Sequence, residues 1–424
     1  MAETAEELAI DFLTVSRLAD PPTEALLAQA LASAGLGAAE YTAAPLRNHT
    51  SGNAAGAAPP KRVRLGTWRL GPQQLLTTAR LVVARHDGPV MDGMGETAFN
   101  AITRGLAAED THTLRTSDLA LDLHLNAPLR EALPALAWAM RLLRTLIDLT
   151  QGVVIDPGAQ TCYGRAALAR FAADDPLAHI VFHDEGWAAD TRWLHTHGLQ
   201  KFGRPELDLV AAPISLEAEG RMFLRDVAER LARGAQLAAG QEIVLEDVGA
   251  AVVAVGAPVD VDHQAPYGRL RLADAPQPGE HQGASAQQLL AHMALADATR
   301  RAQARDLLGS FEVIERVLAA DPDACDALAM KARLHLNSGQ ALDAMQLGEL
   351  MELRAPDDYR GPLTVGLALA AMRRYREALN ALNRAIQRDP DADEVFAARA
   401  TVHEGLGQQQ LAAVDRAHAA YLRK

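Results

Sequence analysis

Cysteine is scarce in this chain of 424 residues, which has only Cys162 and Cys325. Two cysteines can form at most one disulfide bridge, so a disulfide framework is excluded. They also do not form a Cys-x-x-Cys motif, so a thiolate zinc site is excluded. Aromatic residues make up only 4% of the chain, and there are four lysines. Long apolar runs are also missing. The longest, 132–140, stops at Arg141, far short of the roughly 18 residues that a membrane span needs.

The N-terminus has none of the features of a signal peptide. It reads Met-Ala-Glu-Thr-Ala-Glu-Glu, with neither a basic segment nor an apolar stretch. The net charge is −13, and the longest basic block is 61–64. This balance disfavours nucleic acid and anionic membranes as partners. We therefore expect a cytoplasmic protein that binds neither.

What the chain does have is alanine and arginine, 85 and 37 residues respectively. Apolar residues are 49% and charged residues 22%, as in an ordinary soluble globular protein. At about 150 residues per domain, the length predicts two to four domains.

Three prolines at steps of 34 residues, Pro322, Pro356 and Pro390, indicate an internal repeat. Small residues recur at matching positions, where two helices of a hairpin would cross closely: Ala332, Gly366 and Ala400, then Ala344, Ala378 and Ala412. Gly339 and Gly407 fall between the expected helices, where a positive φ is easy for glycine. The pattern resembles the tetratricopeptide repeat (TPR) over 325–356, 359–390 and 393–421, with a weaker unit at 291–322. The Trp typical of its fourth position is absent.

The TPR resemblance implies a helical array over 286–424 with a concave groove for a peptide or helix of a protein partner. The candidate groove residues are Asp326, Arg333, Asn337, Arg360, Leu363, Leu367, Glu394, Thr401 and Glu404. Arg333 stands where carboxylate-clamp TPRs have Asn, and the groove has no Lys, so we expect no clamp for a C-terminal carboxylate. The mixed lining suits an amphipathic segment. Alternatively, the array packs only against the N-terminal domains or a second copy.

The first two thirds of the chain mixes strand and helix patterns. Strands are expected at 9–15, 63–70, 79–85, 119–125 and 153–155, helices at 23–33 and 128–149, and a mobile loop at 48–60. A second unit has expected strands at 180–183, 192–196, 206–211, 242–246, 251–255 and 270–272 and a helix at 216–237. We predict an α+β module, with helices on one face of a mostly antiparallel sheet, followed by the all-α array. The expected domains are 1–175, 176–273 and 286–424, with a linker at 274–285.

Residues 193–199 read Trp-Leu-His-Thr-His-Gly-Leu, then come Phe202-Gly203 and Pro-Glu-Leu-Asp-Leu over 205–209. This stretch resembles the hallmark of a bacterial domain-of-unknown-function family, number 4261. Asp208 stands in place of the usual Glu. The resemblance covers roughly 176–270; it implies an α+β fold and assigns no activity.

His195 and His197 are the sharpest candidates for chemistry. Alternate residues of a strand point to one face, so the two imidazoles could share a metal ion. His183, Asp184 and Glu185 lie near in sequence and could add ligands. A histidine on a strand is more often a surface or hydrogen-bonded residue, and the surrounding hallmark has an architectural character. A metal site is therefore the lesser interpretation.

Two other motifs predict little. Residues 93–98 match Gly-x-Gly-x-x-Ala, but in a dinucleotide loop the first Gly ends a strand directly, and here 85–92 intervene. Cys162 would need a neighbouring base to act as a nucleophile, so we expect a small buried apolar residue instead. There is no Walker-type Gly-Lys-Ser and no Gly-x-Ser-x-Gly elbow.

The sequence favours a non-enzymatic interaction protein. Its array would dock a partner, and its α+β module would recognise or regulate a target. We expect no cofactor. One alternative is a metal-dependent hydrolase centred on His195 and His197, and another is a small-molecule sensor with the array as its output.

Overall fold

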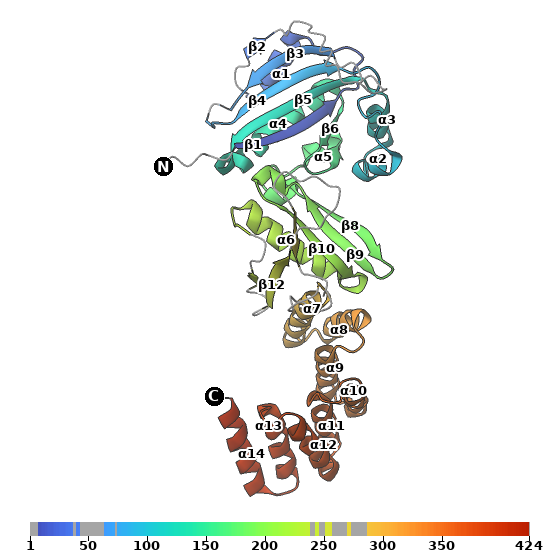
Figure 1. Ribbon diagram of the computed structural model, residues 1–424, viewed down its shortest axis with the longest axis vertical. Coiled ribbons are helices and arrows are strands. Elements are labelled where there is room, and N and C mark those ends of the chain that lie inside the picture. The colour runs from blue at the N-terminus through green and yellow to red at the C-terminus, as the bar shows by residue number, and fades with distance from the viewer. Residues whose placement is uncertain are drawn as a thin grey trace.

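The computed structural model describes residues 7–36, 40–42, 63–72, 74–237, 242–245, 251–256, 269–272 and 286–423. The expected loop at 48–60 and linker at 274–285 lie outside these residues. Two sheets follow one another along the long axis, and a helical array completes the molecule (Figure 1). The predicted fold class is thus confirmed. Among the described residues, no helix is long and apolar enough to cross a membrane.

The first sheet has seven strands in the order β2-β3-β4-β5-β1-β6-β7, and every neighbouring pair is antiparallel. Its strands are β1 Glu7–Val15, β2 Glu40–Thr42, β3 Val63–Leu70, β4 Thr78–Arg85, β5 Leu119–Pro128, β6 Val153–Asp156 and β7 Thr161–Tyr163. The chain's first strand lies between β5 and β6, so pairs from distant parts of the sequence hold the sheet together.

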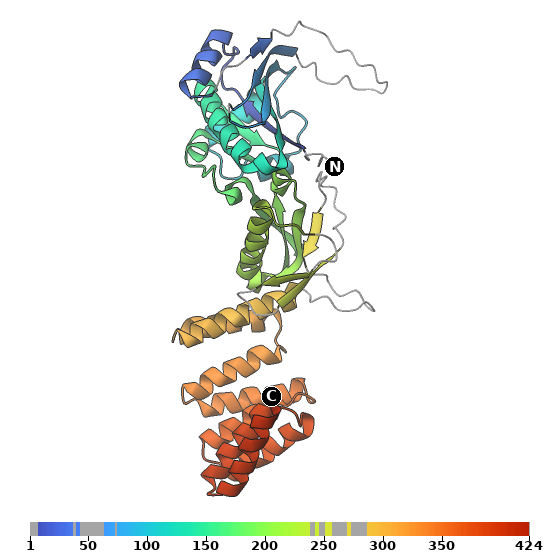
Figure 2. The ribbon, with the colours of Figure 1, turned by 90° about the vertical axis from the view of Figure 1, so that its left-hand side faces the viewer.

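Helices α1 (Glu24–Ser33) and α4 (Ala132–Thr150) cover one face of this sheet (Figure 2). Thr23 caps α1, since its hydroxyl accepts a hydrogen bond from the Leu26 amide at 3.3 Å. The large apolar side chains of α4 pack with Leu8, Ile10 and Phe12 of β1 in one core.

Two further short helices, α2 (Glu96–Ile102) and α3 (Ala108–Thr116), cover part of the other face. Their Phe99 and Leu114 pack with Val15, Val153 and Ile155. This differs from the expectation of helices on one face only. Much of β5 is also buried on both sides, whereas the alternating pattern predicts a half-buried strand. Such short, polar helices contain too few apolar residues to produce a recognisable period.

The second sheet has six strands in the order β11-β12-β13-β10-β9-β8, with β10 and β13 parallel. Its strands are β8 Val181–Ala188, β9 Thr191–His197, β10 Glu206–Pro213, β11 Glu242–Leu245, β12 Ala251–Gly256 and β13 Arg269–Leu272. Helix α6 (Glu217–Ala232) packs Phe223 and Val227 into its core, and the short α5 (Arg165–Ala169) precedes this unit. The predicted helix at 216–237 is shorter, because Gly234 takes a φ of 109° just beyond its end.

The array consists of helix pairs. Its helices are α7 Ala286–Gln303, α8 Leu307–Ala320, α9 Cys325–Asn337, α10 Ala341–Arg354, α11 Arg360–Ala371, α12 Tyr375–Arg388, α13 Asp393–Gly405 and α14 Gln409–Leu422. The second helix of each pair begins 34 residues after the previous one, so the predicted TPR-like period is confirmed.

The small residues predicted for the helix crossings are buried. A Cβ added to Gly366 would lie 2.7 Å from Cγ of Leu382, so a larger residue there would displace the Leu382 side chain of α12. In the weaker first unit the matching residue is Ser310, which is buried and whose hydroxyl donates to the Ala298 carbonyl at 2.8 Å. This bond satisfies the hydroxyl and explains how Ser replaces Ala there.

The turn between the helices of each pair has one residue with positive φ, again at steps of 34. These residues are Arg305, Gly339, Arg373 and Gly407, with φ of 64°, 76°, 60° and 76°. In each turn the following amide bonds to a carbonyl five residues back, as Arg374 does to Leu369. Two turns therefore hold an arginine where the backbone favours glycine.

We predict that Arg373→Gly raises the free energy of unfolding by about 0.5–1 kcal/mol, because it relieves a left-handed conformation that is costly for a residue with a Cβ. Arg373 is exposed and makes no hydrogen bond through its side chain among the described contacts. Arg376→Gly, inside α12, is the matched control and should lower stability instead. Urea unfolding of both variants checks the opposite signs; a loss with Arg373→Gly would contradict the prediction.

Candidate functional site on the inner face of the helical array

The first helices of the pairs form one continuous surface. Helix α9 contacts α7 and α11, and α11 contacts α13. We call the surface of α9, α11 and α13 the inner face. All nine predicted groove residues lie on these three helices.

Arg360 is the most strongly bound of the charged residues on the inner face. Its Nε lies 2.9 and 3.0 Å from the two carboxylate oxygens of Asp358, and its guanidinium also pairs with Asp326 of α9. The hydrogen bond to Asp358 and the nearby carboxylates raise the pKa of Arg360, and the same bond lowers the pKa of Asp358. Asp326 and Arg360 thus tie α9 to α11, and Arg360 is not a free cation.

Glu394 of α13 contacts a residue of α9 and the residue that precedes α11. Its Oε1 accepts a hydrogen bond from the Tyr359 hydroxyl at 2.9 Å, and its Oε2 lies 3.9 Å from a guanidinium nitrogen of Arg333. Burial raises the pKa of Tyr359 to about 12, and the bond to Glu394 adds to this. The Arg333 side chain is 74% exposed, so its charge remains accessible to a partner.

The remaining predicted residues divide between core and surface. Leu363 is 6% exposed and packs in the core of the array, so it offers little surface to a partner. Leu367, one turn further along α11, is 37% exposed. Asn337, Thr401 and Glu404 are exposed; the Thr401 hydroxyl donates to the Ala397 carbonyl, and Glu404 pairs with Arg416 of α14.

The structure brings together the histidines of the second sheet. His183 lies opposite His195 in the β8–β9 register, and the ring centroids of His183, His195 and His197 are 5.0–5.3 Å apart. The rings of His183 and His195 are stacked with 10° between their planes, and Trp193 stacks on His195 at 4.1 Å.

This geometry does not favour the alternative metal centre. Stacked rings place their nitrogens side by side, whereas a shared metal ion needs them aimed at one point. Over the described part of the chain, no group of three or more His, Cys, Asp or Glu residues is placed to hold a metal. His195 and His197 are 1% and 4% exposed, and burial lowers the pKa of His183.

The hallmark stretch builds the connection between β9 and β10. The buried Glu206 carboxylate accepts hydrogen bonds from the Thr196 hydroxyl at 2.8 Å and from the Gly198 and Gln200 amides at 2.8 and 3.2 Å. Burial raises the pKa of Glu206. Gly198 has a φ of 116°, and a Cβ there would lie 2.3 Å from the His179 carbonyl oxygen. These residues therefore act in the architecture of the turn.

Asp208 extends this architecture across the sheet. Its carboxylate forms a bidentate pair with Arg269 of β13, at 2.9 and 2.6 Å, and accepts the Trp193 indole N–H at 2.9 Å. Asp208 and Arg269 are both buried, so the pair holds β9, β10 and β13 in register.

Sequence reasoning missed the pair between Asp208 and Arg269, and it also missed a buried ion pair of Lys201. Lys201 is 2% exposed, and its ammonium pairs with Asp156 and donates to the His179 carbonyl at 3.0 Å. Asp156 ends β6 of the first sheet, whereas Lys201 lies in the short helix after β9, Leu199–Phe202. The pair joins the two sheet units. Its one sequence signal is a lysine directly before Phe202 in a chain with few lysines.

The other two candidates from the sequence are Cys162 and the glycine motif at 93–98, and both lie at positions that suit a structural role. Cys162 lies on β7 and is 8% exposed, and burial raises the pKa of its thiol to about 12, so it is not a thiolate nucleophile at neutral pH. Gly95 is the N-cap of α2, and β4 ends at Arg85, so no strand ends at Gly93.

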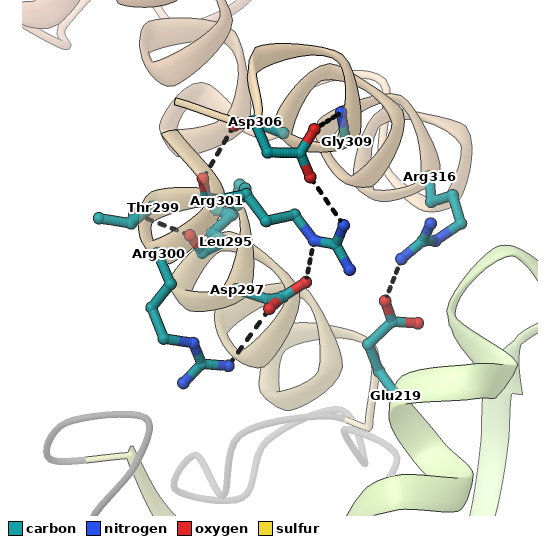
Figure 3. A network of polar contacts seen from close by, with 11 residues as sticks. Glu219, Leu295, Asp297, Thr299, Arg300, Arg301, Asp306, Gly309 and Arg316 are labelled. Carbon is teal, nitrogen blue, oxygen red and sulfur yellow. Dashed lines mark hydrogen bonds and ion pairs between the residues drawn. The ribbon is translucent and has the colours of Figure 1, made fainter. Parts of the chain in front are cut away.

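The first helix pair of the array, α7 and α8, packs against the second sheet unit. Arg316 of α8 bonds to the buried Glu219 of α6 at 2.5 Å (Figure 3). Leu289 and Leu290 of α7 belong to the same core as the apolar residues of β9 and β10. Within the pair, Asp306 caps α8 by accepting the Gly309 amide at 2.9 Å. The core is therefore continuous from the sheets into the array.

No protein-family model matches this chain, and no curated protein does. Among solved structures, the chain is similar to a thermophilic TPR protein of Thermus thermophilus, with 22% identity over 31% of this chain and 74% of that one and a TM-score of 0.30. It is also similar to MamA of Desulfovibrio magneticus RS-1, with 21% identity over 32% and 75% and a TM-score of 0.27. For MamA of AMB-1 the identity is 21%, over 31% and 79%, with a TM-score of 0.26.

The TPR-like character of the array therefore rests on its own 34-residue period of paired helices. The resemblance of 176–270 to the family numbered 4261 stays a prediction.

Proposed function

We propose that this chain is a non-enzymatic adaptor that holds an amphipathic segment of a partner protein on the inner face. The observation that carries the proposal is the exposed apolar Leu367 in the centre of a face that also presents Arg333 and Glu394, charges of both signs. An amphipathic helix or strand would cover the leucine with its apolar side and meet the charges with its polar side.

The α+β module would recognise a second target. Because its core continues into α7 and α8, the module and the array are held in a fixed relation, as an adaptor requires to position two proteins. The same continuity means that a cut at 285 would expose the apolar side of the second sheet unit. The full chain is therefore the proper bait for an experiment.

The test is a point variant of the full chain, Leu367→Glu, which places a charge in the centre of the inner face. Tagged wild type and variant are used to capture proteins from the native lysate, and bound proteins are quantified by mass spectrometry. The matched control is Leu353→Glu, since Leu353 is 76% exposed on α10, away from the inner face. Equal unfolding midpoints of the three proteins show that folding is intact.

We expect at least one protein captured by wild type and Leu353→Glu to be lost with Leu367→Glu, and weakened by Arg333→Glu. The same proteins at the same levels with all four baits would overturn the proposal. So would a loss that is equal for Leu353→Glu and Leu367→Glu, because it would reflect a general effect of added charge.

A further inference from the structure

The first sheet has a face that the described helices α1 and α4 leave open, since they lie on its other side (Figure 2). On this face the register places one row of polar residues across four strands. Arg69 of β3 lies opposite Arg80 of β4, Arg80 opposite His124 of β5, and His124 opposite Asp11 of β1. These long side chains form one wall of a hollow.

The next row on the same face has smaller side chains. Thr78 of β4 lies opposite Asn126 of β5, and Asn126 opposite Ala9 of β1. Together the two rows line a hollow of about 560 Å³. That volume is in the range of ligand sites for small organic molecules, roughly 300–1,000 Å³. The methyl group of Ala9 leaves space that a larger side chain would fill.

Two positive charges lie side by side in the hollow. Like charges directly opposite one another on a sheet repel, and Arg69 and Arg80 are such a pair. Both are exposed, and neither forms a hydrogen bond or ion pair with another described residue. In the register Glu40 of β2 lies opposite Arg69, and at the other end of the row the Asp11 carboxylate is already bonded to Nδ1 of His124 at 2.7 Å. Neither guanidinium group is therefore paired with a carboxylate among the described side chains.

We propose that this hollow binds a small organic anion, whose phosphate or carboxylate group lies between Arg69 and Arg80. Guanidinium groups bind these oxyanions with paired N–H donors, and an anion between them would remove their mutual repulsion. The Thr78 hydroxyl and the Asn126 amide can donate from the neighbouring row. The body of the ligand occupies the space above Ala9. The site is independent of the inner face of the array and adds a ligand to the α+β module.

Calorimetric titration of the full chain tests the proposal, with inorganic phosphate, glycerol 3-phosphate and succinate as probes and sodium chloride of equal ionic strength as the blank. We expect saturable binding of at least one organic probe. Tighter binding of glycerol 3-phosphate assigns a phosphate ligand, and tighter binding of succinate assigns a carboxylate. Arg69→Gln and Arg80→Gln should each weaken binding by about tenfold or more.

Two further variants locate the site. Ala9→Leu keeps every charge but fills the hollow, so it should also weaken the organic probes by about tenfold or more. Arg141→Gln changes an exposed arginine of α4, on the covered side of the sheet, and should bind like wild type. Unfolding midpoints confirm that each variant is folded. Absence of saturable binding to wild type would overturn the proposal, as would unchanged binding in Arg80→Gln or Ala9→Leu.

Discussion

Replacing Lys201 by methionine is expected to lower the free energy of unfolding by about 3–5 kcal/mol, the usual cost of breaking a buried ion pair from one side. The carboxylate of Asp156 is fully buried and would lose its counter-charge between the two sheet units. Methionine fills a similar volume, so the change tests the charge more than the packing. Urea unfolding of wild type and variant, followed by circular dichroism, measures the difference.

Two controls make this result specific. Adding Asp156→Asn to Lys201→Met removes the stranded charge and should recover part of the loss. Arg115→Gln breaks the pair between Arg115 and Glu96, which is solvent-exposed on α3 and α2 and should matter far less. If Lys201→Met cost no more than Arg115→Gln, the buried pair would not hold the two units together.

Acid is expected to destabilise the protein through His179. Burial, with a further contribution from the charge of Lys201, lowers the pKa of this imidazole to about 4. An unfolded histidine takes up its proton near pH 6.5, so protonation favours the unfolded state as the pH falls below that value. His179 makes its full contribution to the free energy of unfolding above pH 6.5. About 3 kcal/mol of that contribution is lost by pH 4.

The measurement is the free energy of unfolding at pH 7, 6, 5 and 4 for wild type and His179→Gln. Glutamine retains an N–H donor for the Ala173 carbonyl, which His179 Nε2 contacts at 2.8 Å, but it does not titrate. The variant should therefore lose less stability between pH 6.5 and 4, while the carboxylates contribute equally to both proteins. His112→Gln, at an exposed position of α3, is the control. Parallel pH curves for wild type and His179→Gln would contradict the assignment.

The helical array could be predicted from the sequence because its determinants are local. Helix hydrogen bonds join residues four apart, and the two helices of a pair are separated by a short turn, so Pro322, Pro356, Pro390 and the intervening small residues repeat in the sequence as the helices repeat in space. Even the two arginines with positive φ follow that period, although nothing in their identity marks them.

The surroundings of the candidate groove residues could be predicted only in part, for a physical reason. All nine residues chosen from the 34-residue register lie on α9, α11 and α13. It cannot show that Arg360 is already bound by Asp358 and Asp326, or that Leu363 is buried while Leu367 is exposed. Such differences depend on how neighbouring pairs pack, which spacing within one pair does not specify.

For this protein, the sequence by itself determined the class of each part: two strand-rich units without a recognised chemistry, followed by an array of helix pairs. Only the tertiary structure decided which charges have partners. Strand order and register bring Lys201 to Asp156 across 45 residues and leave Arg69 opposite Arg80 on an open sheet face. The reason is that helices form from contacts a few residues apart, whereas sheet pairing and buried ion pairs join distant segments whose alignment follows from the packing of the whole core.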